Sequence, residues 1–332
     1  MKNGICTVAA SFLWFAVPAA AQEQATALST AARAAAVVVR ATVVVATDPS
    51  PEWHRLSFRT SEVLKGTVGG SFALLEPAGA CCGRSLFALQ PGQSCLLFLR
   101  QIGAVLHPFG GSRGVLPDEP EIVAHVRAVL QTGNDAALAS LLARNLMHAE
   151  PRVADDAAQA LAVLPRLELA APERQLLAVA LDDAVRRGLT RAAPLLEAAV
   201  RQRDDAMVDE LLRAYLGAHR EDMATLLRKG LGRCRAADVS QRLPMHVVTD
   251  AGALRAAELL VDLPAAEARQ ALLAMLRDQS SPRVQLCVAE GLLAAGMRGE
   301  QLTSALPAPV LDLAQRRLDA PRTFRSITPL RR

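Results

Sequence analysis

The chain has 332 residues, 51% of them hydrophobic, and a formal net charge of +4. This apolar content excludes a disordered chain, and the length allows two domains with sizeable cores. Acidic residues are interspersed with the arginines until the last few residues, so the charge pattern argues against nucleic-acid binding.

Residues 1–21 predict a secretory signal peptide. Lys2 gives the N-terminal region of this segment a positive charge, and residues 5–17 are mostly apolar. Three alanines at 19–21 form a small-x-small cleavage site before Gln22. The apolar stretch is too short for a stable membrane span, and no later segment reaches spanning length without charges. An uncleaved N-terminal anchor is the alternative. We therefore expect a periplasmic or secreted protein without a transmembrane span.

A change of composition near residue 117 predicts a domain boundary. Glycine and aromatic residues concentrate before it, whereas alanine, leucine and arginine dominate after it. The residues that read as strands between Gly-rich turns are 36–46, 53–64, 71–75, 95–99 and 104–109. About five short strands in so short a segment predict a small β-barrel over residues 33–117.

The order of these motifs resembles an exported bacterial OB-like barrel, the fold type shared by netrin modules and tissue inhibitors of metalloproteases. The residues that carry the resemblance are 36–43, 62–66, Cys82-Gly83, Pro91-Gly92, 96–99 and 110–114. In metalloprotease inhibitors an N-terminal cysteine chelates the zinc of the target. Here the expected mature N-terminus is Gln22, with no cysteine near it, so the resemblance implies the fold and not that inhibitory mechanism.

Residues 121–320 show helical periodicity, beginning with Ile122, Val126 and Val129 on one face. The later segments with this pattern are 136–146, 153–164, 173–187, 192–202, 206–216, 222–231, 254–263, 267–277, 284–295 and 309–318. Short helices in long succession predict an α-solenoid, with a compact helical bundle as the alternative. A Pro-x-Val sequence opens the helices at residues 151 and 282 and resembles HEAT-type repeats. We expect irregular helical pairs at about residues 190–243.

The sequence thus predicts an α+β multidomain fold in which a small OB-like β-barrel precedes an all-α HEAT-like solenoid. A basic tail, residues 321–332, follows the helical domain. It is a candidate for weak contact with an anionic surface such as lipid headgroups or cell-wall polymer.

Cys81, Cys82 and Cys95 form the most suggestive cluster of chemistry-bearing residues. Adjacent cysteines do not readily chelate one ion together, so the cluster does not predict a zinc site. A disulfide from the 81–82 turn to Cys95 is expected instead. The resemblance favours Cys82 as the partner, because Cys82-Gly83 fits its pattern better; Cys81 is the alternative.

No Gly-x-Ser-x-Gly elbow, phosphate-binding loop or dinucleotide fingerprint occurs, so we expect no catalytic residue, cofactor site or metal site. Asp182 and Asp183 lie four residues before Arg186 and Arg187 and predict surface ion pairs. The histidines are scattered and are expected at the surface or in helix caps: His54, His107, His125, His148, His219 and His246.

These observations favour a non-enzymatic interaction or scaffold protein whose helical repeats bind a protein partner. The second hypothesis is that the barrel holds a glycan or cell-wall fragment, stacked on Trp53 and Phe109. A third, resting on the fold resemblance alone, is inhibition of a secreted protease.

Overall fold

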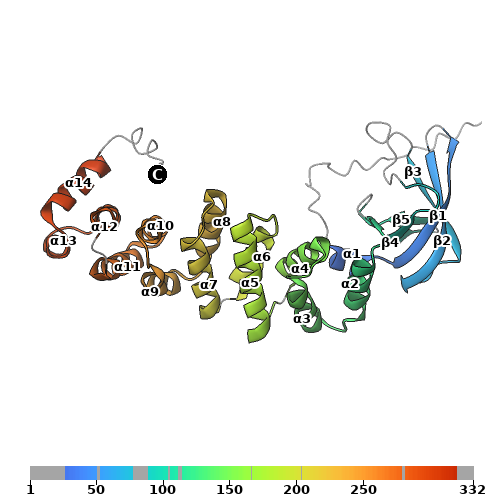
Figure 1. The fold of residues 1–332 in the computed structure, drawn as a ribbon, viewed down its shortest axis with the longest axis horizontal. Helices are drawn as coiled ribbons and strands as arrows, with labels where there is room; N and C mark the ends of the chain where they lie inside the picture. Colours follow the sequence, from blue (N-terminus) through green and yellow to red (C-terminus); the bar gives the residue numbers. More distant parts are fainter. Residues whose placement is uncertain are drawn as a thin grey trace, which may run out of the picture. The chain divides into compact units, whose positions relative to one another are not determined.

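A computed structural model describes residues 27–50, 53–77, 89–103, 105–110, 114–165, 167–202, 204–278 and 281–319 (Figure 1). The chain divides into two compact units between Leu116 and Pro117. The expected signal peptide (residues 1–21) and the basic tail (residues 321–332) lie outside the described residues.

The first unit is a curled antiparallel sheet preceded by a short helix. Its elements are α1 (Leu28–Ala34), β1 (Val37–Ser50), β2 (Trp53–Lys65), β3 (Ser71–Pro77), β4 (Ser94–Ile102), β5 (Val105–Pro108) and β6 (Val115–Pro117). The strand order is β3-β2-β1-β4-β5, with β6 paired to β4. The outer strands β3 and β5 approach each other to within 8 Å between Cα atoms, so the sheet closes into a half-barrel.

Strand β1 is the centre of this sheet because it pairs with β2 on one side and with β4 on the other. Its run of valines suits a strand with a buried face. Register shifts interrupt its pairing with β2, including one between Val43 and Val45. Such bulges bend a strand and increase its twist, which accounts for the curl of the sheet.

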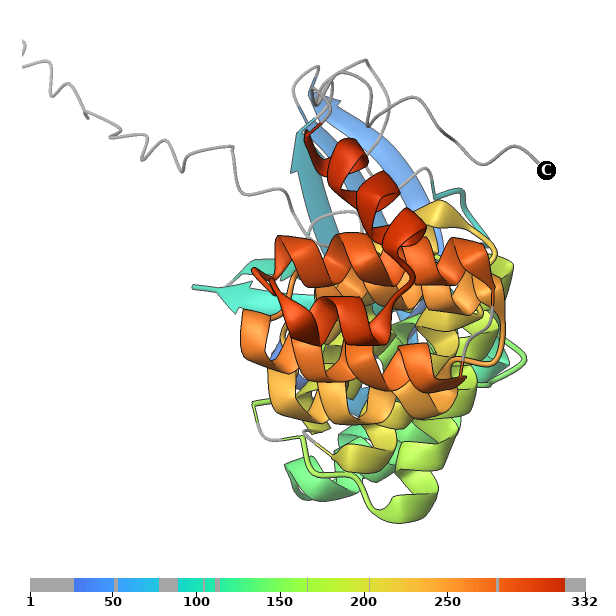
Figure 2. The same cartoon turned by 90° about the vertical axis from the view of Figure 1, so that its left-hand side faces the viewer.

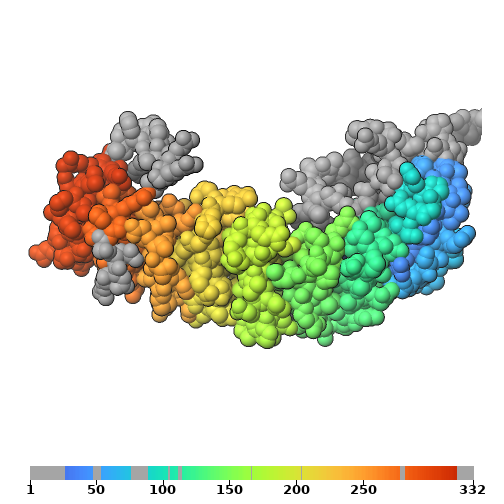
Figure 3. All heavy atoms as spheres, in the orientation of Figure 1, coloured from blue at the N-terminus to red at the C-terminus, as the bar shows by residue number. Residues whose placement is uncertain are grey.

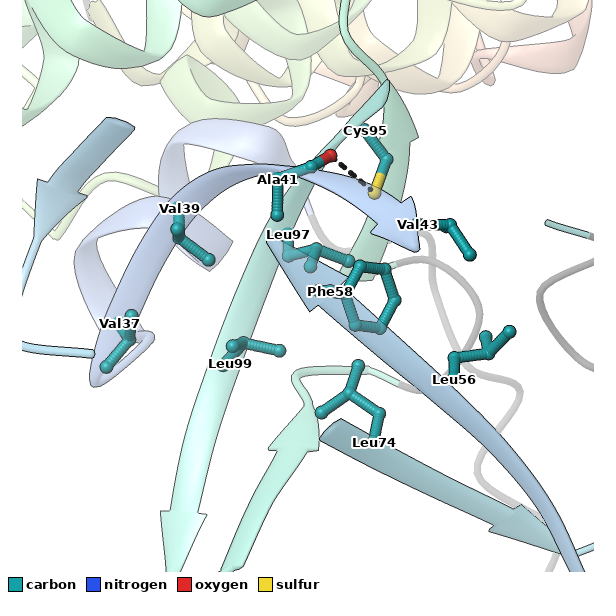
Figure 4. Packing of buried hydrophobic residues seen from close by; sticks show 10 residues of the cluster. All are labelled: Val37, Val39, Ala41, Val43, Leu56, Phe58, Leu74, Cys95, Leu97 and Leu99. Atoms are coloured by element: carbon teal, nitrogen blue, oxygen red, sulfur yellow. Dashed lines mark hydrogen bonds between the residues drawn. The ribbon is translucent and has the colours of Figure 1, made fainter. Parts of the chain in front are cut away.

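The core of the half-barrel contains alternate side chains from four strands (Figure 4). Phe58 of β2 stacks on Phe72 of β3, with ring centroids 5.1 Å apart. The buried residues of this core are Val37, Val39, Ala41, Val43, Leu56, Phe58, Leu74, Cys95, Leu97 and Leu99. In β2 the alternation of apolar side chains marks the face that points inward, whereas β4 is buried at five consecutive residues from Cys95 to Leu99.

The turn after β2 requires a glycine. Gly66 has φ of 75°, and a Cβ atom added there would lie 2.3 Å from the carbonyl oxygen of Ala36. The neighbouring Lys65 donates from Nζ to the carbonyl oxygens of Ala32, at 3.2 Å, and Arg33, at 2.5 Å. This lysine thereby satisfies the last carbonyl groups of α1, a helix that the sequence pattern did not predict.

The second unit is a stack of short helices (Figures 1 and 2). These are α2 (Pro120–Gln131), α3 (Asp135–Asn145), α4 (Pro151–Val163), α5 (Ala171–Arg187), α6 (Ala192–Gln202), α7 (Asp205–Leu216), α8 (Glu221–Leu231), α9 (Ala236–His246), α10 (Asp250–Leu260), α11 (Ala265–Asp278), α12 (Pro282–Ala294), α13 (Glu300–Ala305) and α14 (Ala308–Asp319).

Two rows of helices run through this unit. One row packs α3 on α5, α5 on α7, α7 on α9 and α9 on α11. On the other side α2 packs on α4, α4 on α6 and α6 on α8. Further along the chain α10, which also contacts α7, packs on α12, and α12 packs on α14. In a space-filling view the segments of this unit follow one another in sequence order (Figure 3). Packing between near neighbours in sequence is that of a repeat array, so the expected fold class is confirmed.

Polar contacts between successive repeats recur at a nearly constant separation in sequence. Arg228 of α8 donates to Asp262 at 2.6 Å over a separation of 34 residues. Arg233 pairs with Glu197 over 36 residues, and Arg242 with Asp209 over 33. Ion pairs thus join adjacent helical repeats at a separation of 33 to 36 residues, which is a repeating helical array.

Helix α9 was not expected, and irregular pairs were expected at about residues 190–243. The structure corrects this, because α6 to α9 are ordinary helices in the same stack. The buried residues of α9 are only Val239, Ser240 and Leu243, and Pro244 lies inside the helix. Because α9 has so few apolar residues and contains a proline, its sequence does not show the periodicity that predicts a helix.

Tyr215 is the single tyrosine of the chain and joins α7 to α10. Only 1% of its surface is exposed, and its hydroxyl donates to the carbonyl oxygen of Arg255 at 2.9 Å. Burial, and to a lesser degree the charge of Glu258, raises its pKa to about 12. The phenolate is therefore disfavoured in the folded protein.

We expect the phenolate absorbance of the folded chain to titrate near pH 12, whereas denatured chain titrates near pH 10. Since the folded pKa is the higher one, stability is fully present below pH 10 and is lost as the pH rises towards 12. The loss amounts to about 3 kcal/mol. Ultraviolet titration with and without denaturant measures this shift. Equal midpoints in the two states would contradict the burial of this side chain.

Candidate functional site

A groove between α5 and α7 is a concave feature of the helical unit that combines apolar and charged groups. Its volume is about 440 Å³. The residues that line it are Gln175, Ala178, Val179, Leu181, Asp182 and Arg186 of α5, with Glu210, Arg213 and Ala214 of α7. The two helices lie side by side in one row (Figure 1).

The helical repeat of α5 explains which side chains reach this groove. Gln175, Val179, Asp182 and Arg186 are all exposed and recur every three or four residues, so they share one face. Ala178 and Leu181 lie between them, are buried and form part of the floor of the groove. Because alanines form much of the floor, the groove remains open between the two backbones.

The floor of the groove is apolar, and the rim carries two ion pairs. Asp182 pairs with Arg186 at 2.8 Å, as the four-residue spacing predicted, and Glu210 pairs with Arg213 at 2.8 Å. Val179 lies among them with 44% of its surface exposed. An apolar centre with a polar rim is the usual composition of a protein-binding surface.

The second predicted pair of this helix, Asp183 with Arg187, is also confirmed, with the two groups 3.3 Å apart. Asp183 lies in addition 3.8 Å from Arg191. Each carboxylate of α5 near the groove is therefore held by an arginine. Among the described lining residues there is no His, Cys, Ser or Thr side chain that could act as a nucleophile.

One histidine contradicts the expectation that all of them lie at the surface or in caps. His125 is 4% exposed, and its Nε2 lies 2.6 Å from Oδ2 of Asp156, which is 3% exposed. Asn145 Nδ2 lies 3.0 Å from His125 Nδ1. The cluster joins α2, α3 and α4, and it shows that Asp156 has a buried structural role, whereas Asp155 reaches solvent.

His125 shares the apolar face of α2 with Ile122, Val126 and Val129. Its place on this apolar helix face is the feature of the sequence that indicates burial of His125. Its partner Asp156 is 31 residues away and could not be identified from spacing along one helix.

The expected disulfide involves one described cysteine. Cys95 lies in β4 with its side chain in the core, and its Sγ donates to the carbonyl oxygen of Ala41 at 3.5 Å (Figure 4). Cys81 and Cys82 lie outside the described residues. Pairing of Cys95 with Cys82, or with the alternative Cys81, therefore stays a prediction.

The two aromatic residues expected to stack a ligand lie in different parts of the sheet. Trp53 begins β2 opposite Pro77, and its side chain lies outside what the structure describes. Phe109 follows β5, is half-buried, and donates its backbone N–H to Phe98 at 2.7 Å. Glycan binding by the barrel stays a prediction.

Within the described ranges of both units, no three His, Cys, Asp or Glu side chains gather closely enough to hold a metal ion. No helix in the same ranges combines the length and the apolar character needed to cross a bilayer. No family model, no curated protein and no solved structure matches the chain.

Proposed function

We propose that this chain is a non-enzymatic, extracytoplasmic interaction protein that binds a protein partner through the surface of its helical stack. The signal-peptide pattern of residues 1–21 supports the location. The observation that supports binding of a protein partner is the α5–α7 groove, with its alanine-rich floor and paired charges.

The groove suits the insertion of an apolar side chain from the partner. Its floor offers Ala178, Leu181 and Ala214, and the exposed Val179 stands beside them. The two rim ion pairs are neutral overall and supply both hydrogen-bond donors and acceptors to the polar atoms around an inserted anchor. Anchors of this kind dominate the energetics of protein interfaces.

The test replaces Val179 by arginine, which places a charged side chain over the apolar floor. Native protein, Val179→Arg and the matched control Val163→Arg are immobilised and exposed to extract of the native extracytoplasmic compartment. Val163 is 64% exposed at the end of α4 and does not line the groove. We expect one stoichiometric protein to be retained by native protein and the control. Its affinity for Val179→Arg should fall by about tenfold or more, because the partner's apolar group would have to bury a charge.

The retained protein is then purified, and its dissociation constant is measured against all three variants. Equal affinity for Val179→Arg and native protein would remove the groove as the binding site. Absence of any retained protein would contradict the proposal as a whole and would favour a small ligand of the barrel.

A further inference from the structure

The outer side of β2 presents two arginines that the sheet does not neutralise. Leu56 and Phe58 point into the core, so the alternating residues Arg55, Ser57 and Arg59 point outward. Both arginines are exposed. We call the outward side chains of these three residues and their direct cross-strand neighbours the basic face.

Neighbouring strands place uncharged groups beside both arginines. Arg55 lies opposite Leu75 of β3 on one side and Thr47 of β1 on the other. The corresponding neighbours of Arg59 are Ser71 and Thr42. No acidic side chain occupies a cross-strand position next to either arginine in the described sheet.

Several other arginines of the described chain are neutralised by carboxylates. Arg40 on β1 donates to Glu62 of β2 at 2.9 Å. In the helical unit, arginines such as Arg228 and Arg242 each meet a carboxylate of an adjacent repeat. Against this pattern, no ion pair involves Arg55 or Arg59 within the part of the chain that the structure describes, so their guanidinium groups remain available to an external anion.

The row between the two arginines adds apolar surface. Ser57 lies opposite Ala73 on one side and Val45 on the other. Val45 is 44% exposed, and Leu75, which lies beside Arg55 in the next row, is 47% exposed. Hydroxyl groups, exposed aliphatic side chains and arginine together favour a polypeptide partner over a membrane surface or a purely polyanionic polymer, because arginine and apolar groups are both enriched in protein interfaces.

The spacing defines the partner further. The two arginines are four residues apart on one strand, which corresponds to about 13 Å. An extended segment with carboxylates at two positions four residues apart presents them on one face with the same spacing, and the residue midway between them points the same way. We propose that the basic face binds an acidic, extended segment of another polypeptide, which pairs two carboxylates with Arg55 and Arg59 and places an apolar side chain against Val45.

The probe is a fluorescent heptapeptide with glutamate at its second and sixth positions and valine at its fourth. A control peptide has glutamine at both positions. Fluorescence anisotropy is measured with native protein, with Arg55→Gln/Arg59→Gln, and with the charge-matched control Arg144→Gln/Arg283→Gln, whose arginines are exposed on α3 and α12. Salt is kept at about 10 mM, where the Debye length is about 30 Å.

We expect the glutamate peptide to bind native protein and the helical control equally, and to bind Arg55→Gln/Arg59→Gln at least about tenfold more weakly, because two charge-assisted contacts are lost. The glutamine peptide should show a similar loss on native protein. Thermal melts of all variants verify that the sheet is folded.

Three outcomes would overturn the proposal. One is equal affinity of the glutamate peptide for native protein and Arg55→Gln/Arg59→Gln, and another is no binding to native protein. The third comes from a parallel arm with phosphatidylglycerol vesicles. Vesicle binding that depends on the two arginines, without peptide binding, would assign the face to a lipid surface.

Discussion

Replacing Asp156 by alanine is expected to lower the free energy of unfolding of the helical unit by about 3–5 kcal/mol, because it leaves a buried polar partner without its counterpart. His125 lies 2.6 Å from the carboxylate, and both side chains are almost fully buried. The imidazole is held between α2, α3 and α4, because Asn145 also lies 3.0 Å from its Nδ1.

Urea unfolding, followed by the helical circular dichroism signal, measures this effect. The matched control is Asp155→Ala on the same helix, whose carboxylate is 42% exposed and pairs with Arg191 at 3.4 Å. Loss of such a partly exposed pair costs below about 1 kcal/mol. The double variant His125→Ala/Asp156→Ala should lose less than the sum of the single variants, since each removes the same interaction. Similar losses for Asp155→Ala and Asp156→Ala would contradict the structural role of the pair.

Replacing Phe58 by alanine is expected to destabilise the half-barrel by about 3–5 kcal/mol, the usual cost of removing a buried aromatic ring. Phe58 is 1% exposed at the centre of the core and stacks on Phe72. A small domain has few alternative contacts to fill the cavity left behind.

The measurement for Phe58→Ala is hydrogen exchange of the strand amides, which separates the first unit from the helices. Val63→Ala is the control on the same strand, because Val63 is 40% exposed. We expect exchange to accelerate throughout β1, β2 and β4 in Phe58→Ala and to change little in the control. Unchanged protection in Phe58→Ala would show that this ring does not hold the sheet together.

Residue periodicity was sufficient to predict most elements of the fold. The Val-rich segment at 36–46, the alternation at 53–64 and the helical pattern after residue 121 each correspond to an observed element. Elements with few buried apolar side chains escaped prediction, among them α1, α9 and the six-residue α13. Their positions depend on packing against the rest of the unit, which a single sequence pattern does not contain.

The candidate site was predictable only in part. The pairing of Asp182 with Arg186 follows from spacing on one helix, and the structure confirms it. The groove itself depends on which faces of α5 and α7 meet and on alanines such as Ala178 and Ala214 lying between them. The basic face was likewise predictable only in part. The alternation of its two arginines with Leu56 and Phe58 is visible in sequence, but their uncharged neighbours depend on strand register.

Close packing of successive repeats has a consequence for truncation of the protein. Gly230 of α8 shows how closely the helices approach, because a Cβ atom there would lie 2.6 Å from Leu196 Cδ1 of α6. Such contacts join each helix only to near neighbours, and the groove at α5 and α7 has no close packing with α11, α12 or α14. Stability in such an array is roughly a sum of repeat and nearest-neighbour terms. Proteolytic trimming from the carboxyl end would therefore remove helices a pair at a time, and a shortened protein that still includes α9 would retain the groove intact.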